Sequence, residues 1–143
     1  MRVLTVLLPL GVVGCLNSGA PELHVVADPG QPELVRLHQG QTATFGPTRL
    51  TFTSLTQDSR CPVDAVCVWQ GEARLDLTVG PVDGGAGDVL LHLSTLETTR
   101  RDTLWGTQIH LSGVLPDAKA GVSIAPEDYI AVLELTVLAG GGS

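Results

Sequence analysis

The stretch from residue 58 to residue 73 decides how this chain folds. It reads Asp58-Ser59-Arg60-Cys61-Pro62-Val63-Asp64-Ala65-Val66-Cys67-Val68-Trp69-Gln70-Gly71-Glu72-Ala73. Two of the three cysteines and one of the two tryptophans lie in it, and apolar and polar residues alternate on both sides of it. Such alternation is typical of half-buried β-strands. We therefore predict a corner between two strands, held closed by a Cys61–Cys67 disulfide.

The N-terminal segment has the features of an export signal. Arg2 precedes an apolar run from Val3 to Val13, which is too short for a membrane-spanning helix of ~20 residues. Its end, Val12-Val13-Gly14-Cys15, resembles the lipobox of bacterial lipoproteins. The resemblance implies that residues 1–14 are removed and that Cys15 carries lipid. An ordinary signal peptide with an incidental cysteine and an uncleaved anchor are the alternatives.

Lipidation would place the chain on a membrane of the cell envelope. Two or more acyl chains give stable anchoring. Leu16, rather than Asp, follows Cys15, and in sorted lipoproteins of bacteria with two membranes this favours the outer membrane. We expect a tether over 15–22, one β domain over 23–139 and a flexible tail over 140–143. The six residues 17–22 reach roughly 20–25 Å when extended, so the domain would sit close to the bilayer.

Composition bounds the kinds of partner. Without residues 1–14 the chain has 7 basic and 15 acidic residues, a formal charge of 7 − 15 = −8. An acidic domain with a single lysine is not expected to bind nucleic acid or anionic lipid through a basic patch. The whole chain is 43% hydrophobic and 16% charged, which favours a packed core over disorder. We expect a monomer that contacts the bilayer through Cys15, and an envelope protein as its partner.

Cysteine usage agrees with export. If lipid consumes Cys15, then Cys61 and Cys67 remain as an even pair for an oxidising compartment. The closed loop is short, so the chain-entropy estimate of its stabilisation is only about 2–2.5 kcal/mol. A metal site is the alternative, but no histidine lies nearby to complete a ligand set. We expect no metal and no cofactor.

The remainder of the chain alternates with a period of two residues and shows no amphipathic helix. The segments that carry strand patterns are 23–26, 33–38, 42–45, 49–55, 73–79, 88–93, 107–111 and 129–137. Turn residues separate them at short intervals, and 94–106 is the longest expected loop. About eight short strands predict an all-β fold, an antiparallel β-sandwich, with a partly open β-barrel as the alternative.

The corner supplies the candidate site residues Asp58, Arg60, Asp64, Trp69 and Glu72. The guanidinium of Arg60 suits a bidentate carboxylate, and we expect it to brace the corner rather than to hold a ligand. We expect Trp69 to pack over the disulfide or to cap the core. An exposed Trp69 that serves as a binding platform is the alternative.

Sequence motifs for catalysis are missing. There is no Gly-x-Ser-x-Gly elbow and no phosphate-binding glycine loop. His92 and His110 both fall on the polar face of a predicted strand, so they would be neighbours if those strands paired. A solvent-facing position for each is the preferred interpretation, and a metal-binding pair is the alternative. We assign no catalytic residue.

The corner also resembles a pattern in small uncharacterised bacterial lipoproteins. In those chains Asp-Ser-Arg-Cys-Pro is followed by a short turn and by Cys-x-Trp-x-Gly-(Asn/Glu)-Ala, as at 58–62 and 67–73 here. The chain departs from the pattern at Leu115-Pro116-Asp117, where a second proline or an aromatic residue is expected. The resemblance implies export and a β fold, and it implies no activity.

Two functions follow from these observations. The first is a membrane-anchored envelope lipoprotein whose β-sandwich binds or braces a partner without catalysis, in one version by presenting the Cys61–Cys67 loop as a rigid tip. The second is an enzyme or metal-binding protein that uses the same corner or the His92/His110 pair. The first predicts that the polar side chains of the corner bond to one another, whereas the second predicts that they enter a cleft.

Overall fold

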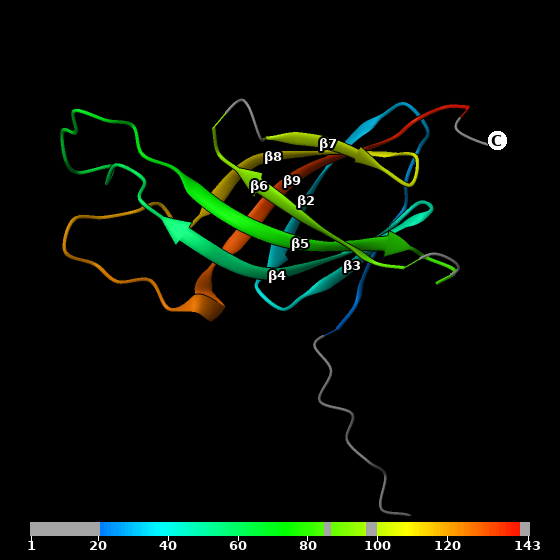
Figure 1. The fold of residues 1–143 in the computed structure, drawn as a ribbon, viewed down its shortest axis with the longest axis horizontal. Helices are drawn as coiled ribbons and strands as arrows, with labels where there is room; N and C mark the ends of the chain where they lie inside the picture. The colour runs from blue at the N-terminus through cyan, green and yellow to red at the C-terminus, as the bar shows by residue number, and fades with distance from the viewer. Residues whose placement is uncertain (1–20, 85–86, 97–99, 141–143) are drawn as a thin grey trace, which may run out of the picture.

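The computed structural model describes residues 21–84, 87–96 and 100–140, which form two stacked β-sheets (Figure 1). The first sheet has the order β1-β3-β4-β5-β6 and the second has the order β2-β9-β8-β7. The signal peptide, Cys15 and most of the predicted tether and tail lie outside the described residues. No described residue is in an α-helix, and nothing in these ranges has the length and apolar character of a membrane-spanning helix. The predicted β-sandwich is confirmed.

The strands follow the predicted segments closely. The first sheet contains β1 (Leu23–Val25), β3 (Thr42–Phe45), β4 (Thr48–Asp58), β5 (Ala73–Pro81) and β6 (Val89–Ser94). The second contains β2 (Pro32–His38), β7 (Arg101–Leu104), β8 (Thr107–Leu115) and β9 (Ile130–Val137). A short 3₁₀ turn, η2 (Pro126–Asp128), precedes β9. All neighbouring strands pair antiparallel except β1 and β3, which are parallel.

One strand was missed by sequence reasoning. Residues 94–106 were expected to be a loop, but β7 lies within them and forms a hairpin with β8. The hairpin turns at Trp105 and Gly106, whose φ angles are 51° and 74°. Two positive φ angles define the type I′ turn that fits the twist of a hairpin. Asn-Gly is the usual sequence of this turn, so the sequence Trp105-Gly106 did not predict it.

The core lies between the two sheets and follows the alternation of the sequence. Every second residue of the central strands is buried, as the pattern in β5 and β9 shows. The largest fully buried side chains are Phe45, Phe52, Leu37, Leu50, Leu75, Leu77, Ile109, Leu111, Leu133 and Leu135. Removal of these apolar surfaces from water is the main source of stability.

Truncation of a core side chain tests this arrangement. Leu133→Ala should lower the free energy of unfolding by about 2–5 kcal/mol, because Leu133 is fully buried and the sandwich cannot close the resulting cavity completely. Leu34→Ala is the matched control, since Leu34 lies on the outer side of β2 and is 61% exposed. Urea denaturation measures both variants. Equal losses would contradict the assignment of Leu133 to the core.

Candidate functional site

Two irregularities in β4 place Asp58 at one end of the sandwich. The pairing of β4 with β5 shifts register between Phe52 and Ser54 and again between Leu55 and Gln57. These β-bulges bring Asp58 opposite Ala73, whose side chain is fully buried. Asp58 therefore faces the gap between the sheets rather than the solvent, and its side chain is only 14% exposed.

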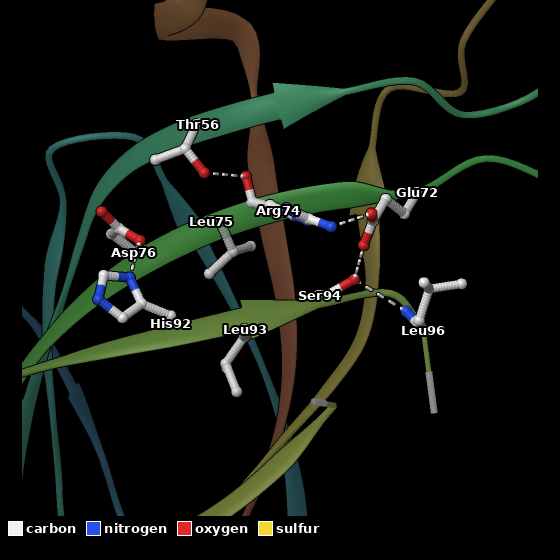
Figure 2. Close-up of a pocket in the computed structure, with 9 residues that line it drawn as sticks. All are labelled: Thr56, Glu72, Arg74, Leu75, Asp76, His92, Leu93, Ser94 and Leu96. Atoms are coloured by element: carbon white, nitrogen blue, oxygen red, sulfur yellow. Dashed lines mark hydrogen bonds and ion pairs between the residues drawn. The ribbon is translucent and has the colours of Figure 1, made fainter. Parts of the chain in front are cut away.

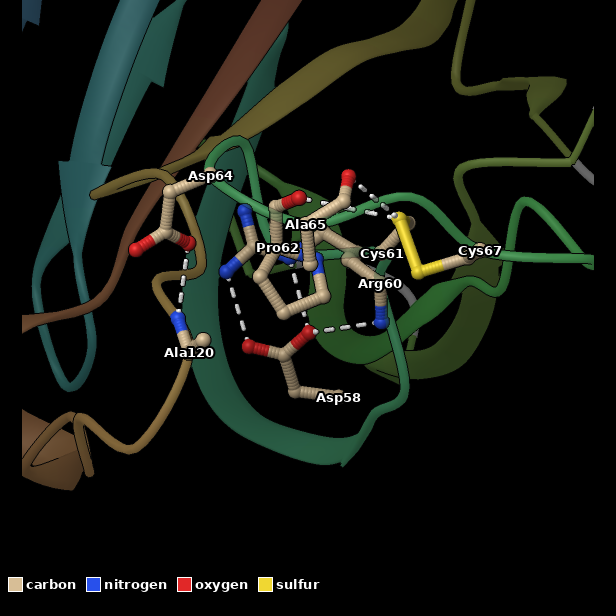
Figure 3. The surroundings of a disulfide bond; sticks show 8 residues. All are labelled: Asp58, Arg60, Cys61, Pro62, Asp64, Ala65, Cys67 and Ala120. Atoms are coloured by element: carbon tan, nitrogen blue, oxygen red, sulfur yellow. Dashed lines mark hydrogen bonds and ion pairs between the residues drawn. A yellow bond between two sulfur atoms is a disulfide. The ribbon is translucent and has the colours of Figure 1, made fainter.

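Asp58 and Arg60 form a bidentate ion pair there. Nε of Arg60 donates to Oδ1 of Asp58 and Nη2 donates to Oδ2, and both donor–acceptor distances are 2.7 Å (Figure 3). Arg60 also donates to two backbone carbonyl oxygens at the end of β8 in the second sheet. These are the carbonyls of Val114, at 2.6 Å, and of Pro116, at 3.1 Å. The hydroxyl of Tyr129 donates to Asp58 at 3.0 Å. We call Asp58, Arg60 and Tyr129 the clamp, because they connect β4 to the ends of β8 and β9.

The clamp is charged near neutral pH. The hydrogen bond from Arg60 is the main cause that lowers the pKa of Asp58 below its ordinary value, and it outweighs the opposing effect of burial. The same bond raises the pKa of Arg60. Burial, followed by the bond to Asp58, raises the pKa of Tyr129. Asp58 is therefore an ionised acceptor that has no proton to give in acid catalysis.

The disulfide loop extends beyond the clamp. Cys61 and Cys67 are bonded, with Cα atoms 5.9 Å apart, and close the loop predicted from the sequence. The neighbouring segment 116–125 supports one side of it. The amide of Val63 donates to the Ala118 carbonyl at 2.9 Å. The amide of Ala120 donates to Oδ1 of Asp64 at 2.9 Å (Figure 3).

Gly71 allows the two arms of the corner to lie against each other. Its φ is +66°, and a Cβ built on it would lie 1.7 Å from the carbonyl oxygen of Ser59. Only glycine accepts both the dihedral angle and the close approach. Ser59 and Cys61 continue the ladder on either side by donating to the carbonyls of Glu72 at 2.7 Å and of Gln70 at 3.0 Å.

The expected packing of Trp69 is wrong. Trp69 is 83% exposed and Val68 is 92% exposed, while Val66 is fully exposed. The physical reason is the position of the loop, which runs past the ends of both sheets (Figure 1), so no core lies beneath it. Trp105, in the turn between β7 and β8, is 36% exposed. We call Val66, Val68 and Trp69 the apolar tip.

The side chain of Glu72 bonds to residues outside the clamp. Its carboxylate accepts from Arg74 and from the hydroxyl of Ser94, each at 2.5 Å. Arg74, followed by Ser94, lowers the pKa of Glu72. The three side chains lie at one end of a hollow of about 490 Å³ on the outer face of the first sheet (Figure 2). We call it the outer hollow.

His92 lies in the outer hollow. Its Nδ1 lies 2.6 Å from Oδ1 of Asp76, and its side chain is 71% exposed (Figure 2). His110 is far from it, on β8 in the other sheet, where its Nδ1 lies 3.8 Å from Oε1 of Glu134. The two strands do not pair, so the structure does not bring these histidines together. Among the described residues, no group of three or more His, Cys, Asp or Glu side chains could hold a metal ion.

A second hollow of about 370 Å³ lies over the clamp. It is lined by Asp58, Arg60, Pro62, Ala118, Lys119, Val122, Ser123, Ile124 and Tyr129. The polar groups of the clamp that reach it already bond to one another. Bracing, the expected role of Arg60, agrees with this geometry, and its carboxylate partner is Asp58.

Sequence reasoning missed the partners that come from distant segments. Tyr129 was assigned to a strand on its periodicity, and nothing in that pattern indicated a bond to Asp58. The Val114 and Pro116 carbonyls carry no sequence signal, because any residue supplies that group. The pairs Asp76–His92 and Glu72–Ser94 depend on the register of β5 with β6, and sequence alternation alone does not give the register.

No protein-family model, curated protein or solved structure matches this chain. The resemblance of the corner to small bacterial lipoproteins therefore stays a prediction. The geometry of the site carries the functional argument.

Acid titration tests the clamp. Asp58→Asn should cost about 1.5–3 kcal/mol of unfolding free energy at pH 7, the scale of hydrogen bonds to a charged group. Because the folded-state pKa of Asp58 is lowered, its contribution is complete above the unfolded pKa of about 4 and disappears as the pH falls through the folded value. The difference in unfolding free energy between the wild type and the variant should therefore be constant from about pH 5 to 7 and shrink below about pH 4.

Urea denaturation at a series of pH values measures this difference. Arg60→Lys provides a second variant that keeps the positive charge and loses the bidentate geometry. It should also destabilise the protein at pH 7. A wild-type advantage over Asp58→Asn that persists unchanged down to pH 2 would contradict the ionised clamp.

Proposed function

We propose that this chain is a lipid-anchored protein of the bacterial envelope whose β-sandwich is a non-catalytic binding module. The recognition surface in this proposal is the apolar tip, of which Val66 lies in the disulfide loop and Val68 and Trp69 directly follow it. One observation carries it: the charged groups at the base of the loop bond to one another, while Val66, Val68 and Trp69 face the solvent. Large exposed apolar side chains that lie close together are typical of interaction sites.

Rigidity supports a role in binding. The loop is closed by the disulfide, bonded to segment 116–125 and supported by the clamp. A preorganised loop loses little conformational entropy when a partner binds. Tryptophan is among the residues that most often dominate the energy of an interface. The tip thus combines an aromatic anchor with a backbone that is held in place before the partner arrives.

The electrostatics of the described residues favour binding over acid–base catalysis. A carboxyl group that acts as a general acid near neutral pH needs a raised pKa. The pKa values of Asp58 and Glu72 are lowered, and each has a positively charged partner. The alternative function, an enzyme or metal-binding protein that uses the corner or a His92/His110 pair, is less well supported because these two histidines lie on different sheets.

Anchoring has its own test. Mass spectrometry of the mature chain should find residues 1–14 removed and Cys15 modified by a diacylglyceryl group. Cys15→Ser should abolish the modification and release the domain from the membrane fraction. An unmodified Cys15 at or near the mature N-terminus would contradict the lipid anchor and leave the binding proposal standing.

Recognition is tested by capture from envelope extracts with the full chain in mild detergent. Trp69→Ala should weaken binding of a captured partner by about 30-fold, equivalent to a hot spot of about 2 kcal/mol. The paired change Val66→Ser/Val68→Ser should weaken it as well. Val26→Ser is the matched control, because Val26 is 86% exposed and lies outside the tip.

A further variant separates the shape of the loop from its side chains. Cys61→Ser/Cys67→Ser keeps the apolar tip and opens the loop, so it should bind more weakly than the wild type while it remains folded by circular dichroism. If the tip variants and the Val26→Ser control retain the same partners with equal affinity, the tip is not the recognition surface.

A further inference from the structure

The outer hollow lies between two groups of polar side chains on the outer face of the first sheet. Figure 2 shows Asp76 with His92 at one end, and Glu72 with Arg74 and Ser94 at the other. Asp76 lies opposite His92, and Arg74 lies opposite Ser94, on the neighbouring strands β5 and β6. Because side chains alternate along a strand, these groups point outward while the leucines between them are buried in the core. The pairing of β5 with β6 therefore fixes their spacing.

Much of the hydrogen-bonding capacity in the outer hollow is unused. Arg74 donates through Nη2 to Glu72, and its Nε and Nη1 donate to no described residue. Oδ1 of Asp76 lies 2.6 Å from Nδ1 of His92, whereas Oδ2 of Asp76 and Nε2 of His92 have no partner in the described part of the chain. A guanidinium has more donors, and a carboxylate more lone pairs, than these bonds use. The hollow therefore offers donors and acceptors side by side.

Charge narrows the class of ligand. Arg74 carries the positive charge of the hollow, while Glu72 and Asp76 carry the negative ones, a formal sum of 1 − 2 = −1. Protonation of His92 would bring that sum to zero. An anionic ligand would meet two carboxylates and would have to compete with Glu72 for the guanidinium. An ammonium ligand would have to compete with Arg74 and His92 for the same carboxylates. The outer hollow thus favours an uncharged ligand.

Hydroxyl groups fit these ion pairs without breaking them. A hydroxyl donates its proton and accepts through its lone pairs, so one group can donate to Oδ2 of Asp76 while a neighbouring group accepts from Nη1 of Arg74. A sugar ring carries several hydroxyls at fixed spacing together with apolar C–H surface. Leu96, beside Ser94 at the end of the hollow, is 40% exposed and provides an apolar contact for that surface (Figure 2).

We propose that the outer hollow binds a neutral polyhydroxylated ligand, a sugar unit that is either free or part of a glycan chain. The volume of about 490 Å³ lies in the range of roughly 300–1,000 Å³ that is usual for ligand sites. The proposal goes beyond recognition by the apolar tip, because no residue of the tip lines this hollow. Its failure would leave the proposed role of the tip untouched.

Nuclear magnetic resonance of the isotope-labelled full chain, in a detergent without a sugar headgroup, tests this assignment. The probes are neutral disaccharides of different ring stereochemistry, namely cellobiose, lactose, mannobiose and N,N′-diacetylchitobiose. At least one should shift the amide signals of Arg74, Asp76, His92 and Leu96 in a saturable way, with a Kd on the order of 1 mM. Succinate and putrescine, the anionic and cationic comparison probes, should bind about tenfold more weakly, since each meets like charge in the hollow.

Paired variants locate the binding groups. His92→Ala and Arg74→Ala should each weaken sugar binding about tenfold, the scale of a lost hydrogen bond. His24→Ala is the matched control for the histidine, because His24 is also exposed on the first sheet and is also bonded through Nδ1. Arg49→Ala is the matched control for the arginine, because Arg49 forms an ion pair with Asp88 outside the hollow. Both controls should keep the wild-type affinity and the wild-type circular dichroism.

Trp69→Ala is a further control, because the apolar face of a sugar also packs on an exposed aromatic ring. This variant should bind the sugar with wild-type affinity. The proposal is overturned if no disaccharide of the panel binds, or if succinate or putrescine binds as tightly as the best sugar. Loss of sugar binding in Trp69→Ala also overturns it, as do equal losses in His92→Ala and His24→Ala.

Sedimentation separates the two sources of the ligand. The full chain is mixed with the insoluble polymer of the preferred sugar, such as cellulose or chitin. Retention by that polymer, lost in His92→Ala and kept in His24→Ala, supports the proposal with a glycan chain as the ligand. Binding of the disaccharide without retention by the polymer supports the proposal with a free sugar as the ligand.

Discussion

The ion pair between Asp58 and Arg60 is the constraint on which the corner depends. β4 and β5 belong to the first sheet, whereas the Val114 and Pro116 carbonyls and Tyr129 belong to the other side of the sandwich. A single guanidinium reaches Asp58 and both carbonyls through its fixed fork of donors, and Asp58 in turn accepts from Tyr129. The end of the sandwich is thereby closed by directional polar bonds at the point where apolar packing ends.

As a result, the polar and apolar side chains of the corner differ in orientation and in bonding. Asp58 and Arg60 face inward, where Asp58 accepts from the Tyr129 hydroxyl and Arg60 donates to the Val114 carbonyl. Asp64 is exposed and accepts from the Ala120 amide. The side chains of the apolar tip, Val66, Val68 and Trp69, face the solvent and are not packed into the core formed by the described residues. This is the reverse of the usual distribution, in which charges face water. The inversion supports an interaction surface, because the cost of exposed apolar area is recovered when a partner covers it.

Sequence periodicity predicted the elements of this fold far better than their connections. Alternation along 73–79 and 129–137 located β5 and β9 because each has one buried face. It did not find β7, since a four-residue strand with Arg101 and Asp102 has no apolar face to show. The corner was located by its cysteines, and the bracing role of Arg60 followed from its chemistry. The exposure of Trp69 did not follow, because burial depends on what lies beneath a loop.

The parallel pairing of β1 with β3 has a mechanical consequence. β1 has only three residues. Among the described residues, its one side-chain hydrogen bond to β3 joins His24 Nδ1 and Thr44 Oγ1 at 2.6 Å. The next backbone hydrogen bond to a distant segment is at Gly30, whose amide donates to the Val137 carbonyl. Tension from an anchor at the N-terminal side would therefore detach β1 first. That step would release residues 21–29, roughly 30 Å of chain, and leave the core intact, so β1 would act as an extensible link that absorbs load before the domain unfolds.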